Sequence, residues 1–159
     1  MKILFDADGL IKTVSSGIFL SMGASCFISQ QVCEETVLEG KRRLYEDAFI
    51  IEQLIENGKI TVREAKMLLP QPGLGKGELS TLALFKALKG DVIIGDDRRF
   101  LTLLDQENIP YLIPTELIVA LVKNKKISIE EGKKALEKMK NLVTTENYND
   151  AYAALGGRR

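Results

Sequence analysis

The stretch ILFDADGLIK at residues 3–12 carries the pattern that decides the fold. A short apolar run over residues 2–5 ends at Asp6 and a turn, which is typical of a buried strand. The stretch VIIGDD at residues 92–97 repeats this arrangement, because three apolar residues are followed by Gly95 and two acids. Strands that are apolar on both faces are typical of a parallel sheet, so we expect both strands to belong to one such sheet.

Helical patterns alternate with strand patterns along the rest of the chain. We expect further strands at residues 26–28 and 111–113, and either a strand or a helix start at residues 59–62. Ser29 and Ser128 are predicted helix caps, and Gly40 and Gly90 are predicted helix stops. The helices are expected over residues 10–22, 30–38, 42–56, 78–88, 99–106, 114–122, 128–142 and 146–155. This alternation predicts an α/β layered fold with a central parallel sheet.

The chain has 159 residues, 22 lysines and arginines, 22 acids and no histidine. Its length suits one globular domain, or one domain with a small appendage. The lack of histidine excludes a Ser-His-Asp triad, a Cys-His nucleophile and a His-Glu-x-x-His zinc site. Cys26 and Cys33 are too few for a disulfide framework or a zinc knuckle, and we expect small buried apolar side chains. Chemistry near neutral pH must then use carboxylates, lysine, tyrosine, serine, cysteine or a bound metal.

The N-terminal residues run directly into a strand, without the apolar segment of a signal peptide. No apolar run reaches the roughly 18 residues that a membrane span needs. We therefore expect a cytoplasmic protein without a membrane segment.

Acidic residues follow the two strands at the point where each strand ends, namely Asp6, Asp8, Asp96 and Asp97. Ligands bind outside the carboxyl ends of the strands in a parallel sheet. Glu78 heads the apolar stripe of its helix, and Glu35 lies on the inner face of the helix over residues 30–38. An acid at a strand end or helix start also serves as a turn or cap residue, and this interpretation stays open for the four aspartates and Glu78. Glu35, taken alone, is more typical of a surface residue.

Carboxylates that converge repel one another, so a cluster persists only if it holds protons or cations. Oxygen ligands without histidine suit Mg²⁺ or Mn²⁺, which bind phosphate oxygens and can activate water. The cluster therefore predicts a hydrolase that acts on a phosphate ester.

Four motifs resemble, in order, the acidic motifs of PIN domains: Asp6 in ILFDADGLIK, Glu35 in ISQQVCEETVLEG, Glu78 in GLGKGELSTLALFKAL and Asp96 in VIIGDDRRFLTLL. The resemblance covers residues 1–122. Residues 123–159 are similar to the helical extension of a small prokaryotic PIN subgroup related to VapC toxins. The resemblance to PIN domains implies that residues 1–122 form a nuclease domain with a three-layer α/β/α fold and a central parallel sheet. The C-terminal helices of residues 123–159 would pack on or beside that domain.

The resemblance implies a metal-dependent ribonuclease that hydrolyses single-stranded RNA with a metal-activated water. Its catalytic residues would be Asp6, Glu35, Glu78 and Asp96, and the Mg²⁺ or Mn²⁺ ligands Asp6, Glu78, Asp96 and Asp97. It also implies a homodimer and, for a toxin-like member, an antitoxin partner. The chain departs from the common pattern at Asp8 and at Gly95, where many members have serine or threonine.

Basic residues near the acids are candidate RNA contacts, chiefly Lys76, Arg98 and Arg99. Setting aside the six candidate site acids leaves 16 acids against 22 bases. A zero net charge is therefore compatible with an acidic pocket inside a mildly basic exterior, and with a nucleic-acid substrate.

Two alternatives use the same residues. The stretch ILFDADGLI is also similar to the nucleophile motif of haloacid-dehalogenase-like phosphatases, in which Asp6 would attack phosphorus. That interpretation leaves Glu35 and Glu78 without a role. The second alternative is a catalytically inactive PIN-fold binding module that acts through its helical surface.

Overall fold

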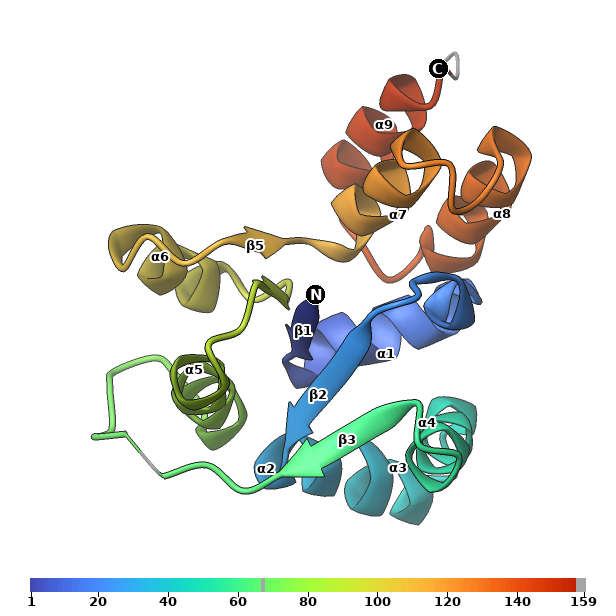
Figure 1. The fold of residues 1–159 in the computed structure, drawn as a ribbon. Helices are drawn as coiled ribbons and strands as arrows, with labels where there is room; N and C mark the ends of the chain where they lie inside the picture. The colour runs from blue at the N-terminus through green and yellow to red at the C-terminus, as the bar shows by residue number, and fades with distance from the viewer. Residues whose placement is uncertain (67, 157–159) are drawn as a thin grey trace.

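A computed structural model describes residues 1–66 and 68–156, and the last three residues of the predicted extension lie outside this range. Its five-stranded sheet has the order β3-β2-β1-β4-β5, and all neighbouring strands are parallel (Figure 1). The strands are β1 (Lys2–Phe5), β2 (Ser25–Ser29), β3 (Ile60–Arg63), β4 (Val92–Ile94) and β5 (Tyr111–Leu112). Phe5 pairs with Ile94, so the carboxyl ends of β1 and β4 lie side by side. The predicted parallel sheet is confirmed.

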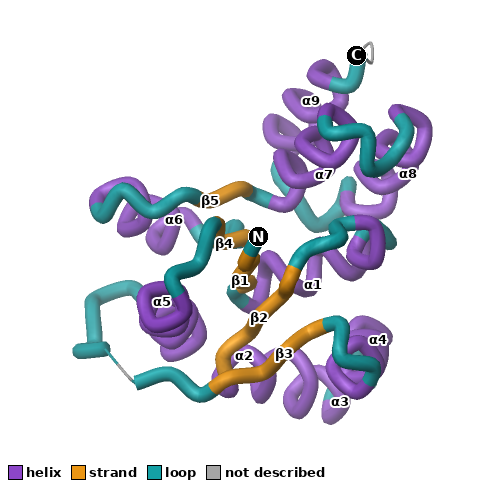
Figure 2. The backbone as a smooth tube through the Cα atoms, viewed as in Figure 1, coloured by secondary structure: helices purple, strands orange, loops and turns teal. Residues whose placement is uncertain are grey.

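Helices connect the strands and flank the sheet on both faces (Figure 2). They are α1 (Ala7–Ser16), η1 (Phe19–Ser21), α2 (Gln30–Cys33), η2 (Glu34–Leu38), α3 (Glu39–Arg42), α4 (Glu46–Glu56), α5 (Lys76–Leu88), α6 (Arg98–Gln106), α7 (Pro114–Lys123), α8 (Ile129–Met139) and α9 (Thr145–Ala154). Among the helices of residues 1–66 and 68–156, none is long and apolar enough to cross a membrane.

Alternation along β1 builds the layers on the two faces of the sheet. Phe5 belongs to the core cluster that α1 and α7 complete, whereas Leu4 packs in a second cluster with Leu82 of α5 and Phe100 of α6. Leu4 and Phe5 are both fully buried, since successive side chains of a strand point to opposite faces. The predicted three-layer α/β/α architecture is confirmed.

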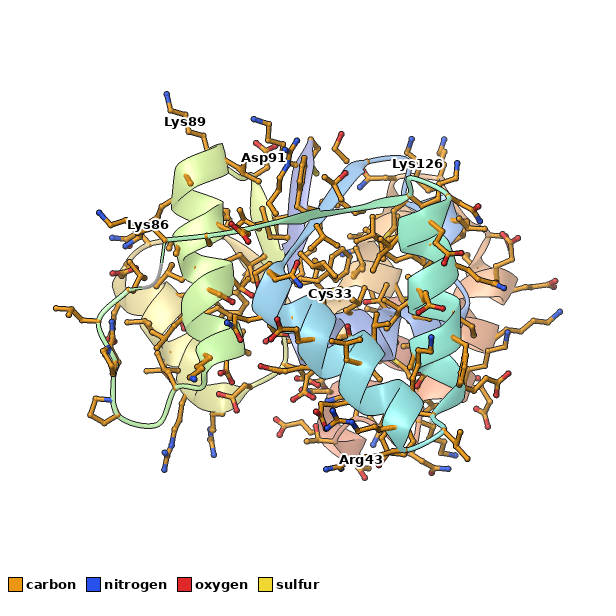
Figure 3. The ribbon with its side chains drawn as sticks, turned by 90° about the horizontal axis from the view of Figure 1, so that it is seen from below. Cys33, Arg43, Lys86, Lys89, Asp91 and Lys126 are labelled. Carbon is orange, nitrogen blue, oxygen red and sulfur yellow. The ribbon has the colours of Figure 1, made fainter. Side chains whose placement is uncertain are left out.

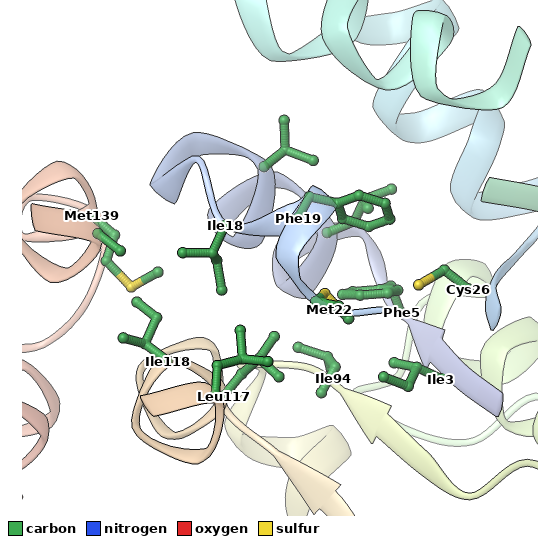
Figure 4. Packing of buried hydrophobic residues seen from close by; sticks show 14 of the residues in the cluster. Ile3, Phe5, Ile18, Phe19, Met22, Cys26, Ile94, Leu117, Ile118 and Met139 are labelled. Carbon is green, nitrogen blue, oxygen red and sulfur yellow. The ribbon is translucent and has the colours of Figure 1, made fainter. Parts of the chain in front are cut away.

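The C-terminal helices share the core of the sheet (Figure 4). Leu136 and Met139 of α8 belong to the same apolar cluster as Phe5 and Ile94, and Figure 4 places Ile118 of α7 beside Met139. Helices α8 and α9 therefore pack on the sheet domain through α7 and α1. The division of the chain at residue 122 stays a prediction.

The glycine predicted to end the helix after residue 38 has a different role. The helix continues through the π-helical turn η2 into α3, which ends at Arg42. A Cβ on Gly40 would lie 2.7 Å from the Cβ of Ala48, so this glycine lets α3 approach α4. The predicted stop at Gly40 is wrong because tertiary packing, and not a left-handed cap, requires a small residue there.

Other element ends also differ from expectation. Lys89 (φ 52°) adopts the left-handed cap of α5, whereas Gly90 packs against Phe85 and Leu4. Of the ambiguous residues 59–62, the last three belong to β3 (Ile60–Arg63), because Ile60 pairs beside β2 and is buried. Helix α1 ends at Ser16, before the left-handed Gly17 (φ 81°).

The cysteines are free, as expected from their number and spacing. Cys26 is buried in the core, and burial raises the pKa of its thiol to about 11. Cys33 of α2 is half-buried, so the prediction of full burial holds for Cys26 alone.

Figure 3 also shows Lys86 and Lys89 projecting outward at the C-terminal end of α5.

Candidate active site

Asp6 follows β1 directly and begins helix α1. Its Oδ1 accepts a hydrogen bond of 2.7 Å from the Gly9 amide, which makes it the N-cap, and its own amide donates to the Ile94 carbonyl at 3.2 Å. The residue is only 2% exposed. Burial, with the nearby carboxylates of Asp8, Glu78 and Asp96, raises the pKa of Asp6 to about 7, while the bond from Gly9 lowers it.

Two glycines leave room for the Asp6 carboxylate. A Cβ on Gly95 would lie 2.7 Å from Asp6 Oδ2, and a Cβ on Gly9 would lie 2.9 Å from Asp6 Oδ1. The close contact with Asp6 therefore favours a residue without a side chain at position 95. Backbone of β4 and α1 closes around the carboxylate on both sides.

Glu78 lies in the first turn of α5. Its Oε2 accepts a hydrogen bond of 2.7 Å from the Gly75 amide, so the side chain folds back over the start of its own helix. The hydroxyls of Ser80 and Thr81 each donate to the Gly77 carbonyl at 2.8 Å. The buried Ser29 and Ser80 hydroxyls lie 2.6 Å apart, and this contact fixes the start of α5 against the end of β2.

Glu35 lies in the π-helical turn η2, opposite the start of α5. Its carboxylate reaches Gly77, where a Cβ would lie 2.6 Å from Oε1 and where the backbone amide hydrogen-bonds the side chain. Although the residue is exposed, burial of its carboxylate and the charges of Glu78 and Asp8 raise the pKa of Glu35. The Glu35 carboxylate therefore contacts the start of α5, while the residue as a whole is exposed.

A small cavity of about 90 Å³ brings these acids together at the carboxyl end of β1. It is lined by Asp6, Ala7, Asp8, Glu35, Gly77 and Glu78. The cavity has room for an ion and a few water molecules, since one water takes about 30 Å³ of liquid. A much larger cavity of about 680 Å³ lies beside β5, α7 and α9, away from these carboxylates.

Asp96 lies close to the cavity but outside its lining. Its charge raises the pKa of Asp6, so the two carboxylates are near one another. Its Oδ2 forms an ion pair of 2.6 Å with Lys12 Nζ from α1. The sequence reasoning missed Lys12, although its spacing of four residues from Asp8 places it on the same face of α1.

The remaining predicted residues lie outside the cavity. Asp97 is the N-cap of α6, and its Oδ1 accepts a hydrogen bond of 2.9 Å from the Phe100 amide. Lys76 begins α5 and is exposed. Arg98 is exposed and lines a separate cavity of about 550 Å³ with Asp96, while Arg99 packs over Gly73.

The donor chemistry fits a hard divalent cation, because the ligands at hand are carboxylate oxygens without histidine. The side-chain positions fit less well. Within the part of the chain that the structure describes, no three acids or cysteines converge as a metal-ligand set. Asp96 is held by Lys12, Glu78 by the Gly75 amide and Asp97 by the Phe100 amide. An ion would therefore have to draw some of these side chains away from their present partners.

One known family matches most of the chain. A family model described as a PIN domain matches residues 8–148. The chain belongs to the PIN-domain family. PIN domains are typically nucleases that use divalent metals, and the match includes Glu35, Glu78 and Asp96 but begins two residues after Asp6. No curated protein and no solved structure matches the chain.

Proposed function

We propose that this PIN-domain protein is a metal-dependent ribonuclease that cleaves single-stranded RNA at the cavity of Asp6, Asp8, Glu35 and Glu78. The observation that carries the proposal is that these carboxylates line one small cavity at the end of β1, around an Asp6 with a pKa raised to about 7. Perturbed acids in a small polar cavity are typical of catalytic sites. The family match places the chain among nucleases and does not support the phosphatase alternative.

We assign Asp6, Glu78 and Asp96 as ligands of Mg²⁺ or Mn²⁺, with Asp97 as a further candidate. Such an ion, when bound, supplies Lewis acidity that lowers the pKa of a water molecule and neutralises the carboxylates. Asp6 is the rigid member of the set, because the Gly9 amide and the adjacent Gly95 hold its carboxylate in place. Asp96 becomes available as a ligand when its ion pair with Lys12 opens.

Glu35 is the candidate general base in this proposal. It is exposed to incoming substrate, and its Oε1 faces the cavity beside Gly77. A carboxylate with a raised pKa accepts a proton from water more readily than an ordinary one, so Glu35 Oε1 would take the proton of the attacking water. Lys76, Arg98 and Arg99 would contact RNA phosphates from the exposed surface around the acids.

The homodimer expected from the family resemblance is part of the proposal. Large apolar side chains are exposed over residues 38–50, where Leu44 is 81% and Tyr45 54% exposed. Exposed apolar clusters of this kind mark protein interfaces. This surface supports a protein partner, either a second copy or an antitoxin, and light scattering of the purified protein tests the first.

The test of the ribonuclease is cleavage of labelled single-stranded RNA in Mn²⁺, with and without EDTA. We expect cleavage that EDTA abolishes and that Glu35→Gln slows by about a hundredfold or more, since loss of a general base costs that much. Glu34→Gln is the matched control, because Glu34 is the preceding residue of the same turn and does not line the cavity.

Two results would contradict the proposal. RNA that stays intact in Mn²⁺ would favour the inactive binding module. Cleavage that persists unchanged in both Glu35→Gln and Asp6→Asn would show that the activity does not come from this cavity.

A further inference from the structure

A lysine side chain ends among the acids at the carboxyl end of the sheet. Lys12 Nζ lies 2.6 Å from Asp96 Oδ2, and the two side chains are 19% and 11% exposed. The other ion pairs recorded for residues 1–66 and 68–156 involve side chains that are 34–78% exposed. Lys12 and Asp96 therefore form the least exposed ion pair of the described chain.

Neighbouring elements of the fold place Lys12 next to Asp96. Helix α1 begins at the Asp6 cap and carries Lys12 on its second turn, while Asp96 follows β4, the neighbour of β1. Removing two charges from water costs free energy, which a close pair recovers only with good geometry. Without the ammonium, the Asp96 carboxylate would lose its 2.6 Å cationic partner and keep its repulsion with the nearby Asp6 carboxylate.

The pair also holds Asp96 outside the lining of the cavity. Asp96 Oδ2 is engaged by the ammonium and points to α1, whereas Asp6, Glu35 and Glu78 line the cavity. A divalent ion that uses Asp96 Oδ2 competes with Lys12 Nζ, because two cations at one oxygen repel each other in a poorly solvated site.

We propose that Lys12 is a built-in cation that occupies Asp96 in the metal-free protein and competes with the divalent ion for it. The inference rests on the proposed metal-dependent function and deepens it. Lys12 is then a positioning residue that lowers the metal affinity of the site. Metal binding and release of Asp96 from Lys12 are one coupled event.

The test is Mn²⁺ binding to the full chain, measured by isothermal titration calorimetry after EDTA treatment and dialysis. Lys12→Gln keeps a hydrogen-bond donor and removes the charge, and we expect it to bind Mn²⁺ about tenfold or more tightly than the natural protein. Lys12→Arg keeps the charge, and we expect it to show no tightening. Lys41→Gln is the matched control, because Lys41 pairs with Glu52 at 2.8 Å on a remote and more exposed surface.

A double-mutant cycle ties the effect to Asp96. In an Asp96→Asn background the charge that attracts both cations is gone, so Lys12→Gln should lose most of its gain in Mn²⁺ affinity. Lys12→Met serves as a second neutral variant if Lys12→Gln folds poorly, as judged by circular dichroism. Thermal denaturation gives an independent readout, since Mn²⁺ should raise the Tm of the neutral variants more than that of the natural protein.

The outcomes separate the two proposals. Equal or weaker Mn²⁺ binding by both neutral variants, with binding by the natural protein intact, would overturn the role of Lys12 and leave the ribonuclease standing. Tightening that persists unchanged in the Asp96→Asn background would also overturn it. The absence of Mn²⁺ binding from the natural protein and every variant would refute the metal-dependent function, and the role of Lys12 with it.

Discussion

Asp6 should make the metal-free protein less stable as the pH rises, and replacing it with asparagine should remove this effect. The carboxylate is buried and has a pKa of about 7, against an ordinary value of 3.8. Between these two pH values the folded chain keeps a proton that the unfolded chain has lost. Because the folded state binds more protons, raising the pH favours unfolding.

The magnitude follows from the two pKa values. The difference between 3.8 and about 7 corresponds to about 4 kcal/mol of unfolding free energy, lost progressively between pH ~4 and pH ~7. Solvent screening reduces this figure little, since Asp6 is 2% exposed. Asparagine keeps an oxygen for the Gly9 amide, so the helix cap survives while the ionisation is removed.

The assay is urea unfolding in EDTA across this pH range, for the natural protein and Asp6→Asn. We expect Asp6→Asn to gain stability relative to the natural protein as the pH rises, by up to about 4 kcal/mol at pH ~8. Asp97→Asn is the matched control, because Asp97 caps α6 in the same way from a less buried position. A stability difference between Asp6→Asn and the natural protein that stays constant with pH would refute the reasoning.

Two further substitutions test the packing around the site, and a third tests a remote, exposed ion pair. Gly95→Ala should lower the free energy of unfolding in urea by about 1–3 kcal/mol, because its Cβ would lie 2.7 Å from Asp6 Oδ2. An unchanged unfolding midpoint would contradict this close approach. Ser80→Ala should lower the free energy of unfolding by about 1–2 kcal/mol in the same assay, since it leaves the buried Ser29 hydroxyl without its 2.6 Å partner. If the losses of Ser80→Ala and Ser29→Ala simply add in the double variant, the two hydroxyls do not interact. Lys41→Met, which breaks an ion pair with more than a third of each side chain exposed, should change stability by less than about 1 kcal/mol.

The fold could be predicted largely from local patterns. The apolar runs of β1 and β4 are buried on both faces, so their composition alone indicates a parallel sheet. Helix ends were harder to predict, as Gly40 and Gly90 show. Both glycines resemble helix stops in sequence, yet each is needed for a close approach to a residue from another element.

The site could be predicted in part. Asp6, Glu35 and Glu78 were expected from their order and spacing, and the structure brings them to one cavity with Asp8. Asp96 and Asp97 were expected as metal ligands, but Asp96 pairs with Lys12 and Asp97 caps α6. Sequence spacing indicates which acids meet at one sheet edge, but it does not indicate which of them already has a partner.

The sequence by itself determined the layer architecture and the acids that gather at the ends of β1 and β4, because both depend on periodicity and on the order of residues along the chain. Only the tertiary structure decided the electrostatic state of the site. The raised pKa of Asp6, the room left by Gly95 and the pairing of Lys12 with Asp96 all depend on contacts between segments distant in sequence. Burial and the distance between charges are properties of the folded chain. The protonation of Asp6 and the ion pair of Asp96 therefore depend on the packing of α1 beside the end of β4.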